Sequence, residues 1–224
     1  MAMVQQKPDF ARAYSKANEI LVQSSVIDTF PYSPKALVKE QTITPCRSYK
    51  KAREKYGVEM TAFGSESAVL MAYQGRNIIF YDDSKPDTHI RFSILHELGH
   101  DVNGHDLSIK ETDTEKYHRY EVETNYFAAQ LLMPEQIIRE LQRRGVRITK
   151  RFLQEQFCVS GQAADKRIET LAKTNAEWRS RAEKEFDDII LLKYADFLNK
   201  ISPIRNYFDF EDEYARQQER NRWY

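Results

Sequence analysis

The chain has 224 residues, a length that suits one compact domain or two small ones whose hydrophobic core is large enough to fold without disulfides. Its 34 Lys and Arg residues balance 34 Asp and Glu residues, so net charge gives no general attraction to nucleic acids or anionic membranes. The apolar runs are too short for a transmembrane helix, and the first residues lack the apolar segment of a signal peptide. With only two cysteines, the composition favours a protein of the reducing cytoplasm.

Two helices are predicted in the first quarter of the chain. Apolar residues at helical spacing predict a helix over 10–27, which ends before Pro31 and Pro34 because each proline disfavours helix in the residue before it. A second, short helix is predicted over 46–56 and is closed by Gly57.

A β-hairpin follows these helices. Two apolar runs, 68–73 and 78–81, flank a turn at residues 74–77, a pattern typical of paired antiparallel strands. Its exposed edge is a candidate for holding an extended peptide by backbone pairing. The sequence is equally consistent with a strand pair that only covers the core.

From residue 87 the pattern is helical almost to the end of the chain. Polar residues from Asp106 to Lys116 predict a loop, and Gly145 closes a helix that begins after Pro134. The predicted helices cover residues 87–105, 115–133, 135–144, 148–157, 162–173 and 186–201. The pair at 148–173 has the size of a helix-turn-helix unit.

The segment that indicates chemistry is His96-Glu97-Leu98-Gly99-His100, an H-E-x-x-H motif inside a predicted helix. Residues four apart share a helix face, so both imidazoles can bind one Zn2+ at about 2.0–2.1 Å. Glu97 lies beside them, where a carboxylate can accept the proton of a water that zinc makes acidic and pass it to a leaving amine. The motif therefore predicts a zinc site with Glu97 as catalytic base and acid.

A tetrahedral catalytic zinc needs a third protein ligand. In a continuing helix His105 rotates off the ligand face, so we interpret it as a polar residue at the helix end. Glu121, in a largely apolar predicted helix, shares a face with Asn125, so we predict Glu121 as the third ligand and Asn125 as a residue that orients a ligand. Glu123 points about 200° away around the helix and is the fallback ligand.

The motif and the block Glu121-x-Glu123-x-Asn125-x-Phe127-Ala128-Ala129-x-Leu131-Leu132-Met133-Pro134 together resemble the ImmA/IrrE family of metallo-endopeptidases over roughly residues 45–173. Thr124 stands where the family usually has alanine, and we expect this change to leave the ligands untouched. The resemblance implies a gluzincin-like zinc peptidase that cleaves helix-turn-helix repressors of phage, mobile-element or stress-response genes.

The expected architecture is α+β, with a mostly helical zincin-like core and a small hairpin over 1–145. A helical region with the helix-turn-helix-like unit (146–173), a long helix and a tail follows over 146–224. The hydrogen-bond donor that stabilises the oxyanion stays open among five side chains: Tyr73, Tyr81, His89, His105 and His118.

An alternative function rests on the predicted helix-turn-helix unit, which carries a net charge of +3. The unit has six basic residues, Arg147, Lys150, Arg151, Lys166, Arg167 and Lys173, against the three acids Glu155, Asp165 and Glu169. The rival hypothesis is a DNA-binding or protein-interaction module, of the toxin-antitoxin kind, with a structural or vestigial zinc site. Only Gln162 at the start of the second helix suits base recognition, so we do not expect direct DNA binding.

The acidic, aromatic tail 207–214 is a candidate docking segment for a partner or for the body of the protein.

Overall fold

The computed structural model describes residues 7–59, 61, 66–106, 114–203 and 218. In this part of the chain it shows the expected mostly helical α+β fold, with one small sheet. In chain order the elements are α1 (Phe10–Gln23), α2 (Pro34–Gln41), β1 (Cys46–Ser48), α3 (Tyr49–Tyr56), β2 (Ala68–Tyr73), β3 (Arg76–Tyr81), α4 (Asp87–Asn103), α5 (Thr114–Leu132), α6 (Glu135–Arg143), α7 (Lys150–Phe157), α8 (Gly161–Lys173), a 3-10 turn (Ala176–Trp178), α9 (Asp187–Lys193) and α10 (Ala195–Ile201).

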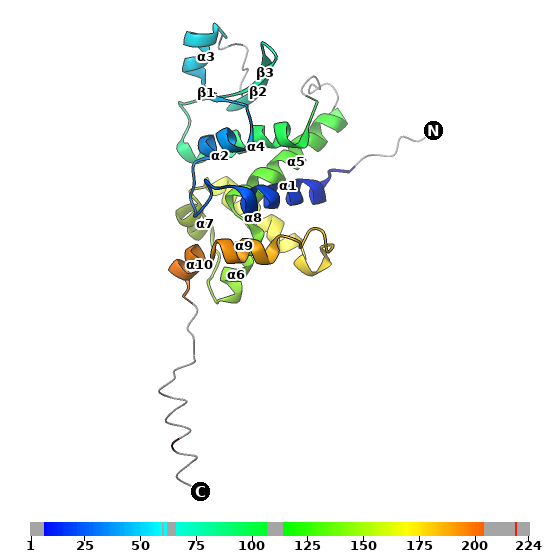
Figure 1. Cartoon of the computed structure of the whole chain (residues 1–224), viewed down its shortest axis with the longest axis vertical. Coiled ribbons are helices and arrows are strands. Elements are labelled where there is room, and N and C mark those ends of the chain that lie inside the picture. The colour runs from blue at the N-terminus through cyan, green and yellow to red at the C-terminus, as the bar shows by residue number, and fades with distance from the viewer. Residues whose placement is uncertain (1–6, 60, 62–65, 107–113, 204–217, 219–224) are drawn as a thin grey trace, which may run out of the picture.

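The elements form three tiers (Figure 1). The sheet and α3 lie at one end of the molecule, and α6 to α10 lie at the other. Between them, α5 packs against both α1 and α4. The motif helix α4 is therefore held between the sheet on one side and α5 on the other.

The sheet has the order β1-β3-β2, with β2 antiparallel and β1 parallel to β3. Gln74 and Gly75 both have positive φ angles and alone form the turn, so the predicted four-residue turn was too long. The helix predicted over 46–56 begins only at Tyr49, because residues 46–48 pair with β3 and the Ser48 hydroxyl accepts the Lys51 N–H as a helix cap.

The first predicted helix was too long. It ends at Gln23, and the Ser24 hydroxyl accepts the backbone N–H groups of Val26 and Ile27 in place of a further helical turn. Pro34, interpreted from the sequence as a helix breaker, instead opens α2, with the Ser33 hydroxyl as its cap.

The long C-terminal helix predicted over 186–201 is broken at Tyr194 into α9 and α10. The buried Tyr194 hydroxyl donates to the carbonyl oxygens of Leu21 and Ile27. Lys193 donates to three carbonyl oxygens at the end of α1, where a cation is favoured by the helix dipole. These contacts tie the C-terminal helices to α1.

One main hydrophobic core runs through the described part of the chain. It includes residues of α1, α4, α5 and α6, and also residues of α7, α8 and the segment between them: Leu153, Phe157, Val159 and Ala164. The helix-turn-helix-sized unit therefore packs on the same core as the motif helix. The division of the chain near residue 145 stays a prediction, and the tail at 207–214 lies outside the described residues.

Among the described helices, none combines the length and apolar character that a membrane span requires.

Gly99 allows α4 and α5 to approach closely. A Cβ atom at this position would lie 3.0 Å from Phe127 Cδ1 and 3.3 Å from the Cα of Thr124. The second distance involves backbone, which cannot move aside as a side chain can. A larger residue would therefore crowd the crossing of the motif helix and α5, where glycine fits.

Substitution of Gly99 by Val tests this approach. We expect Gly99→Val to lower the free energy of unfolding by about 1–3 kcal/mol, because the added carbons overpack the α4–α5 contact. Urea unfolding followed by circular dichroism measures the change. Ala172→Val, at an exposed position of α8, is the matched control and should cost less than about 0.7 kcal/mol. Equal losses in the two variants would contradict the role assigned to Gly99.

Candidate active site

The two histidines of the motif face each other from adjacent turns of α4. His96 Nε2 and His100 Nε2 lie 3.2 Å apart. Both side chains are partly buried, at 14% and 12% exposure. The helical spacing of four residues thus brings the two imidazoles to one point, as the sequence predicted.

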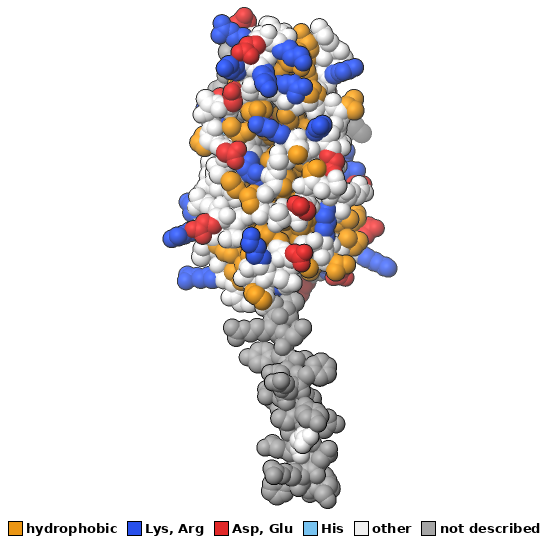
Figure 2. All heavy atoms as spheres, turned by 60° about the vertical axis from the view of Figure 1, so that its left-hand side comes forward, with side chains coloured by type: hydrophobic (Ala, Val, Ile, Leu, Met, Phe, Trp, Pro, Cys, Tyr) orange, Lys and Arg blue, Asp and Glu red, His pale blue; other side chains and the backbone are white. Residues whose placement is uncertain are grey.

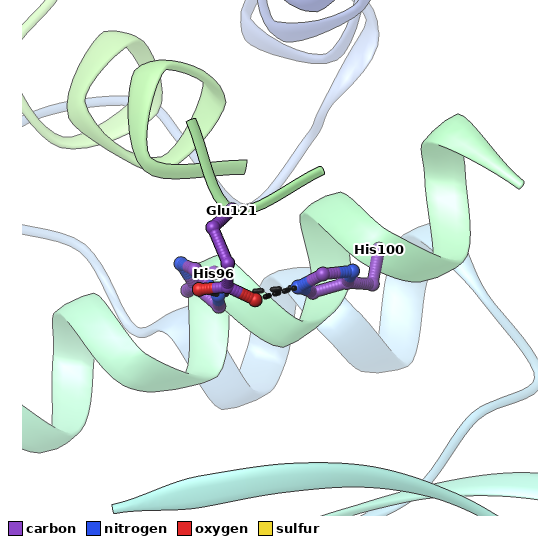
Figure 3. A group of neighbouring side chains, drawn as sticks. All are labelled: His96, His100 and Glu121. Carbon is purple, nitrogen blue, oxygen red and sulfur yellow. Dashed lines mark hydrogen bonds and ion pairs between the residues drawn. The ribbon is translucent and has the colours of Figure 1, made fainter. Parts of the chain in front are cut away.

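Glu121 joins these imidazoles from α5. Its carboxylate oxygens lie 3.3 Å from His96 Nε2 and 3.4 Å from His100 Nε2 (Figure 3). Within the described ranges these three residues are the one group of His, Cys, Asp or Glu side chains that offers three ligand atoms within 4.8 Å of one another.

The spacing of these atoms fits a metal ion. Two donors bound to one tetrahedral zinc at about 2.0–2.1 Å lie about 3.3–3.4 Å apart. The two Nε2 atoms lie 3.2 Å apart, Glu121 Oε2 lies 3.3 Å from His96 Nε2, and Glu121 Oε1 lies 3.4 Å from His100 Nε2. Two imidazoles and one carboxylate are also a donor set of catalytic zinc sites. The residues present therefore fit zinc.

The electrostatics of His96, His100 and Glu121 favour a positive charge bound among these three side chains. Burial alone would raise the pKa of Glu121, but the hydrogen bonds from His100 and His96 hold it well below its usual value. Burial lowers the pKa of His96, yet Glu121 and Glu97 outweigh this effect and raise it. In the absence of a metal, a proton shared with the carboxylate fills the same electrostatic role, so metal binding here releases protons.

Asn125 lies one turn after Glu121 on α5 and contacts the first histidine. Its Oδ1 atom is 3.2 Å from His96 Nδ1. An amide oxygen only accepts, so His96 carries a proton on Nδ1, which leaves Nε2 to face His100 and Glu121. We call His96, His100 and Glu121 the ligand group. The contact is the one expected of a residue that orients a ligand.

Glu123, the fallback ligand, does not join the group. It is only 6% exposed and faces the opposite side of α5, where its carboxylate accepts from the Asp9 backbone N–H (2.8 Å) and contacts His105 Nε2 (3.0 Å). Of the two acidic candidates, the structure places Glu121 beside both imidazoles.

His105 is not the polar helix-end residue expected from the sequence. It is 8% exposed, stacks on the Tyr120 ring at 3.9 Å and contacts His100 Nδ1 at 3.1 Å. The helix ends at Asn103, and Gly104 takes a left-handed conformation that turns the chain back toward the motif. Gly104 is the signal that could have predicted this return.

The surroundings of His105 keep its ring neutral. Burial, with His100 beside it, lowers the pKa of His105 to about 4. A neutral imidazole has one donor and one acceptor nitrogen. Both nitrogens are therefore engaged with His100 and Glu123, which leaves none for an oxyanion.

Glu97 lies beside the ligand group with one oxygen fixed. Its Oε2 atom accepts the backbone N–H of Leu70 in β2 at 2.8 Å. Burial raises the pKa of Glu97, although His96 and His100 act in the opposite direction. A raised carboxylate pKa suits a group that takes up and releases a proton near neutral pH.

A cleft of about 380 Å³ opens in front of these residues. Residues 66–70 form one wall, and side chains of α4 and α5 form the other, including His89, Tyr117 and Tyr120. Of the five oxyanion candidates only His89 lines this cleft, whereas the two tyrosines were missed by sequence reasoning. They occupy the turn of α5 before Glu121 and share its exposure to the cleft.

Thr124 corrects another expectation. Its hydroxyl lies 3.2 Å from His96 Nε2, so replacing the family's usual alanine does not leave the ligands untouched. The same hydroxyl lies 3.0 Å from the Tyr120 carbonyl oxygen and 3.1 Å from that of Glu121, to which it donates.

A comparison with protein families agrees with this geometry. The model of a peptidase family described as IrrE N-terminal-like domain matches residues 49–169, which is more than half of the chain. The match covers α3 to most of α8 and includes every residue of the ligand group. No curated protein matches the chain significantly.

Loss of the Glu121 carboxylate should weaken metal binding. We expect Glu121→Ala to weaken zinc affinity by more than about 100-fold, because the outer partners of zinc ligands alone are worth about 10- to 100-fold. Competition with a chromophoric chelator measures the affinity. Glu115→Ala, at an exposed position of the same helix, removes an equal charge and should bind zinc as the wild type does. Tight, equimolar zinc in Glu121→Ala would show that Glu121 is not a ligand.

Proposed function

The chain belongs to the ImmA/IrrE family, whose members are of the metallopeptidase type, and we propose that it is a zinc-dependent endopeptidase with His96, His100 and Glu121 as zinc ligands. The observation that carries this proposal is the convergence of the three donor groups in a cleft beside a sheet edge and the partly buried carboxylate of Glu97. Each of these parts is needed to hydrolyse a peptide bond, and all of them lie on neighbouring elements.

The zinc ion, when bound, supplies Lewis acidity that lowers the pKa of a water molecule and polarises the scissile carbonyl. Glu97 supplies the proton transfer. Its Oε2 is held by the Leu70 N–H, so Oε1 is the atom we assign to take the proton of the attacking water. The same atom then delivers the proton to the leaving amine nitrogen, which restores the carboxylate.

The outer edge of β2 is the proposed binding surface for the substrate backbone. β2 is the outer strand of the sheet in the described residues. The Leu70 N–H donates to Glu97, which shows that it points away from β3. In an antiparallel ladder alternate residues point the same way, so Ala68 also presents its backbone N–H and C=O at this edge. An extended peptide paired there lies along the cleft.

The proposed substrate is a helix-turn-helix transcriptional repressor in the cytoplasm. This part of the proposal rests on the family resemblance and on the composition. A protein substrate accords with a peptidase family.

The features of α7 and α8 do not favour the DNA-binding alternative. Arg167 is 1% exposed, and its guanidinium donates to Met133 O and Gln130 Oε1 in the core. Most of the other basic side chains of the unit form ion pairs, namely Lys150 with Asp165, Arg151 with Glu155, and both Lys166 and Lys173 with Glu169. Figure 2 shows basic and acidic side chains interspersed over one face of the molecule. We propose that this unit is structural or docks the substrate.

Glu97→Gln separates catalysis from metal binding. We expect this variant to keep equimolar zinc and to lose cleavage by about 100- to 10,000-fold, because the amide cannot accept the proton. Candidate repressors encoded beside the gene are incubated with each protein, and mass spectrometry identifies the products. Glu115→Gln is the control and should cleave as the wild type does. Cleavage by Glu97→Gln at the wild-type rate would contradict the role of Glu97.

A further inference from the structure

A chain of hydrogen bonds runs from the second motif histidine through α4 and α5 to the start of α1. His100 Nδ1 contacts His105 Nδ1 at 3.1 Å, and His105 Nε2 contacts Glu123 Oε2 at 3.0 Å. The other carboxylate oxygen, Oε1, accepts the Asp9 backbone N–H at 2.8 Å. We call these residues the Glu123–His105–His100 chain.

The Glu123–His105–His100 chain fixes the proton positions on the imidazoles of His105 and His100. The Glu123 carboxylate only accepts, so the proton of the His105 ring lies on Nε2, and its Nδ1 is an acceptor. The 3.1 Å contact between the two Nδ1 atoms needs one proton, which His100 therefore supplies. His100 therefore keeps its proton on Nδ1, so Nε2 can offer its electron pair to a metal that displaces the proton shared with Glu121.

A carboxylate at position 123 satisfies all these contacts while the His105 proton stays on Nε2. Both groups that face Oε1, the Asp9 N–H and the Arg119 guanidinium at 3.8 Å, can only donate hydrogen bonds. The group that faces Oε2 is also a donor. An amide has one oxygen and one NH2 group, so with the His105 proton on Nε2 it leaves either the Asp9 N–H or the His105 N–H facing another donor.

We infer that Glu123 and His105 are positioning residues for the metal centre, which act through His100 by holding its proton on Nδ1 and its ring in place. This inference deepens the proposed function and rests on it. The first histidine obtains the same arrangement from Asn125, so the two zinc-binding nitrogens are prepared by different partners.

The substitution Glu123→Gln tests the role of the Glu123–His105–His100 chain. When the amide oxygen accepts the Asp9 N–H, the NH2 group donates to His105 and reverses the proton positions, which puts the His100 proton on the zinc-binding Nε2. Zinc binding must then break one of these hydrogen bonds. We expect zinc affinity to fall about 10- to 100-fold in chelator competition. The absorption bands of the Co2+-substituted protein should shift as the histidine ligand is displaced.

His105→Phe provides a second, independent variant. The phenyl ring keeps the stack on Tyr120 but removes both nitrogens, so it abolishes the bias on His100 without reversing it. We expect a smaller loss of zinc affinity than in Glu123→Gln. Adding Glu123→Gln to His105→Phe should cause no further loss, because no imidazole remains to transmit the change.

Glu115→Gln controls for the change of charge on α5, and circular dichroism verifies that each metal-free variant is folded. Should Glu123→Gln not fold, His105→Phe decides the matter through its zinc affinity. Wild-type affinity in either folded variant, or additive losses in the double variant, would overturn the inference while leaving the proposed zinc site intact. Failure of the wild type to bind zinc would instead overturn both.

Discussion

The site depends on the close crossing of α4 and α5 at Gly99. Two imidazoles from α4 and one carboxylate from α5 meet within hydrogen-bonding range where the helices approach closely at a residue without a side chain. Glu121 lies three residues before Thr124, whose Cα would be 3.3 Å from a Cβ at position 99. The apolar residues of α5 that pack below this crossing hold the ligand spacing that a metal requires. Core packing thus sets the geometry of the polar group above it.

Three buried or partly buried carboxylates surround the crossing, and each is stabilised by a different partner. Glu121 faces two imidazoles, Glu97 accepts the backbone N–H of Leu70, and Glu123 accepts both the His105 ring and the Asp9 backbone. A buried charge without such partners costs several kcal/mol, so these contacts determine which carboxylate takes which role. Glu121, which lies between two imidazoles, is suited to bind a cation. Glu97, which lies at the sheet edge, is suited to take up and release a proton.

The sequence predicted the parts of the fold and site that follow from local periodicity. The H-E-x-x-H spacing placed His96 and His100 on one helix face, and the four-residue step on α5 placed Asn125 behind Glu121. The hairpin and most helices from residue 87 onwards were also predicted within a few residues of their bounds. What the sequence left open were contacts between elements distant in the chain. The short strand β1 needs the neighbouring β3, and the break at Tyr194 needs the end of α1. His105 returns to His100 through a left-handed Gly104, a conformation that helical periodicity does not encode.

The most direct test of the metal centre is a crystal structure of the purified protein with anomalous diffraction recorded on both sides of the zinc absorption edge. The proposed function predicts one zinc ion bound to His96 Nε2, His100 Nε2 and a Glu121 oxygen at about 2.0–2.2 Å, with a fourth position open to the cleft. Zinc bound elsewhere, or a ligand group that binds no zinc when the metal is supplied, would contradict it.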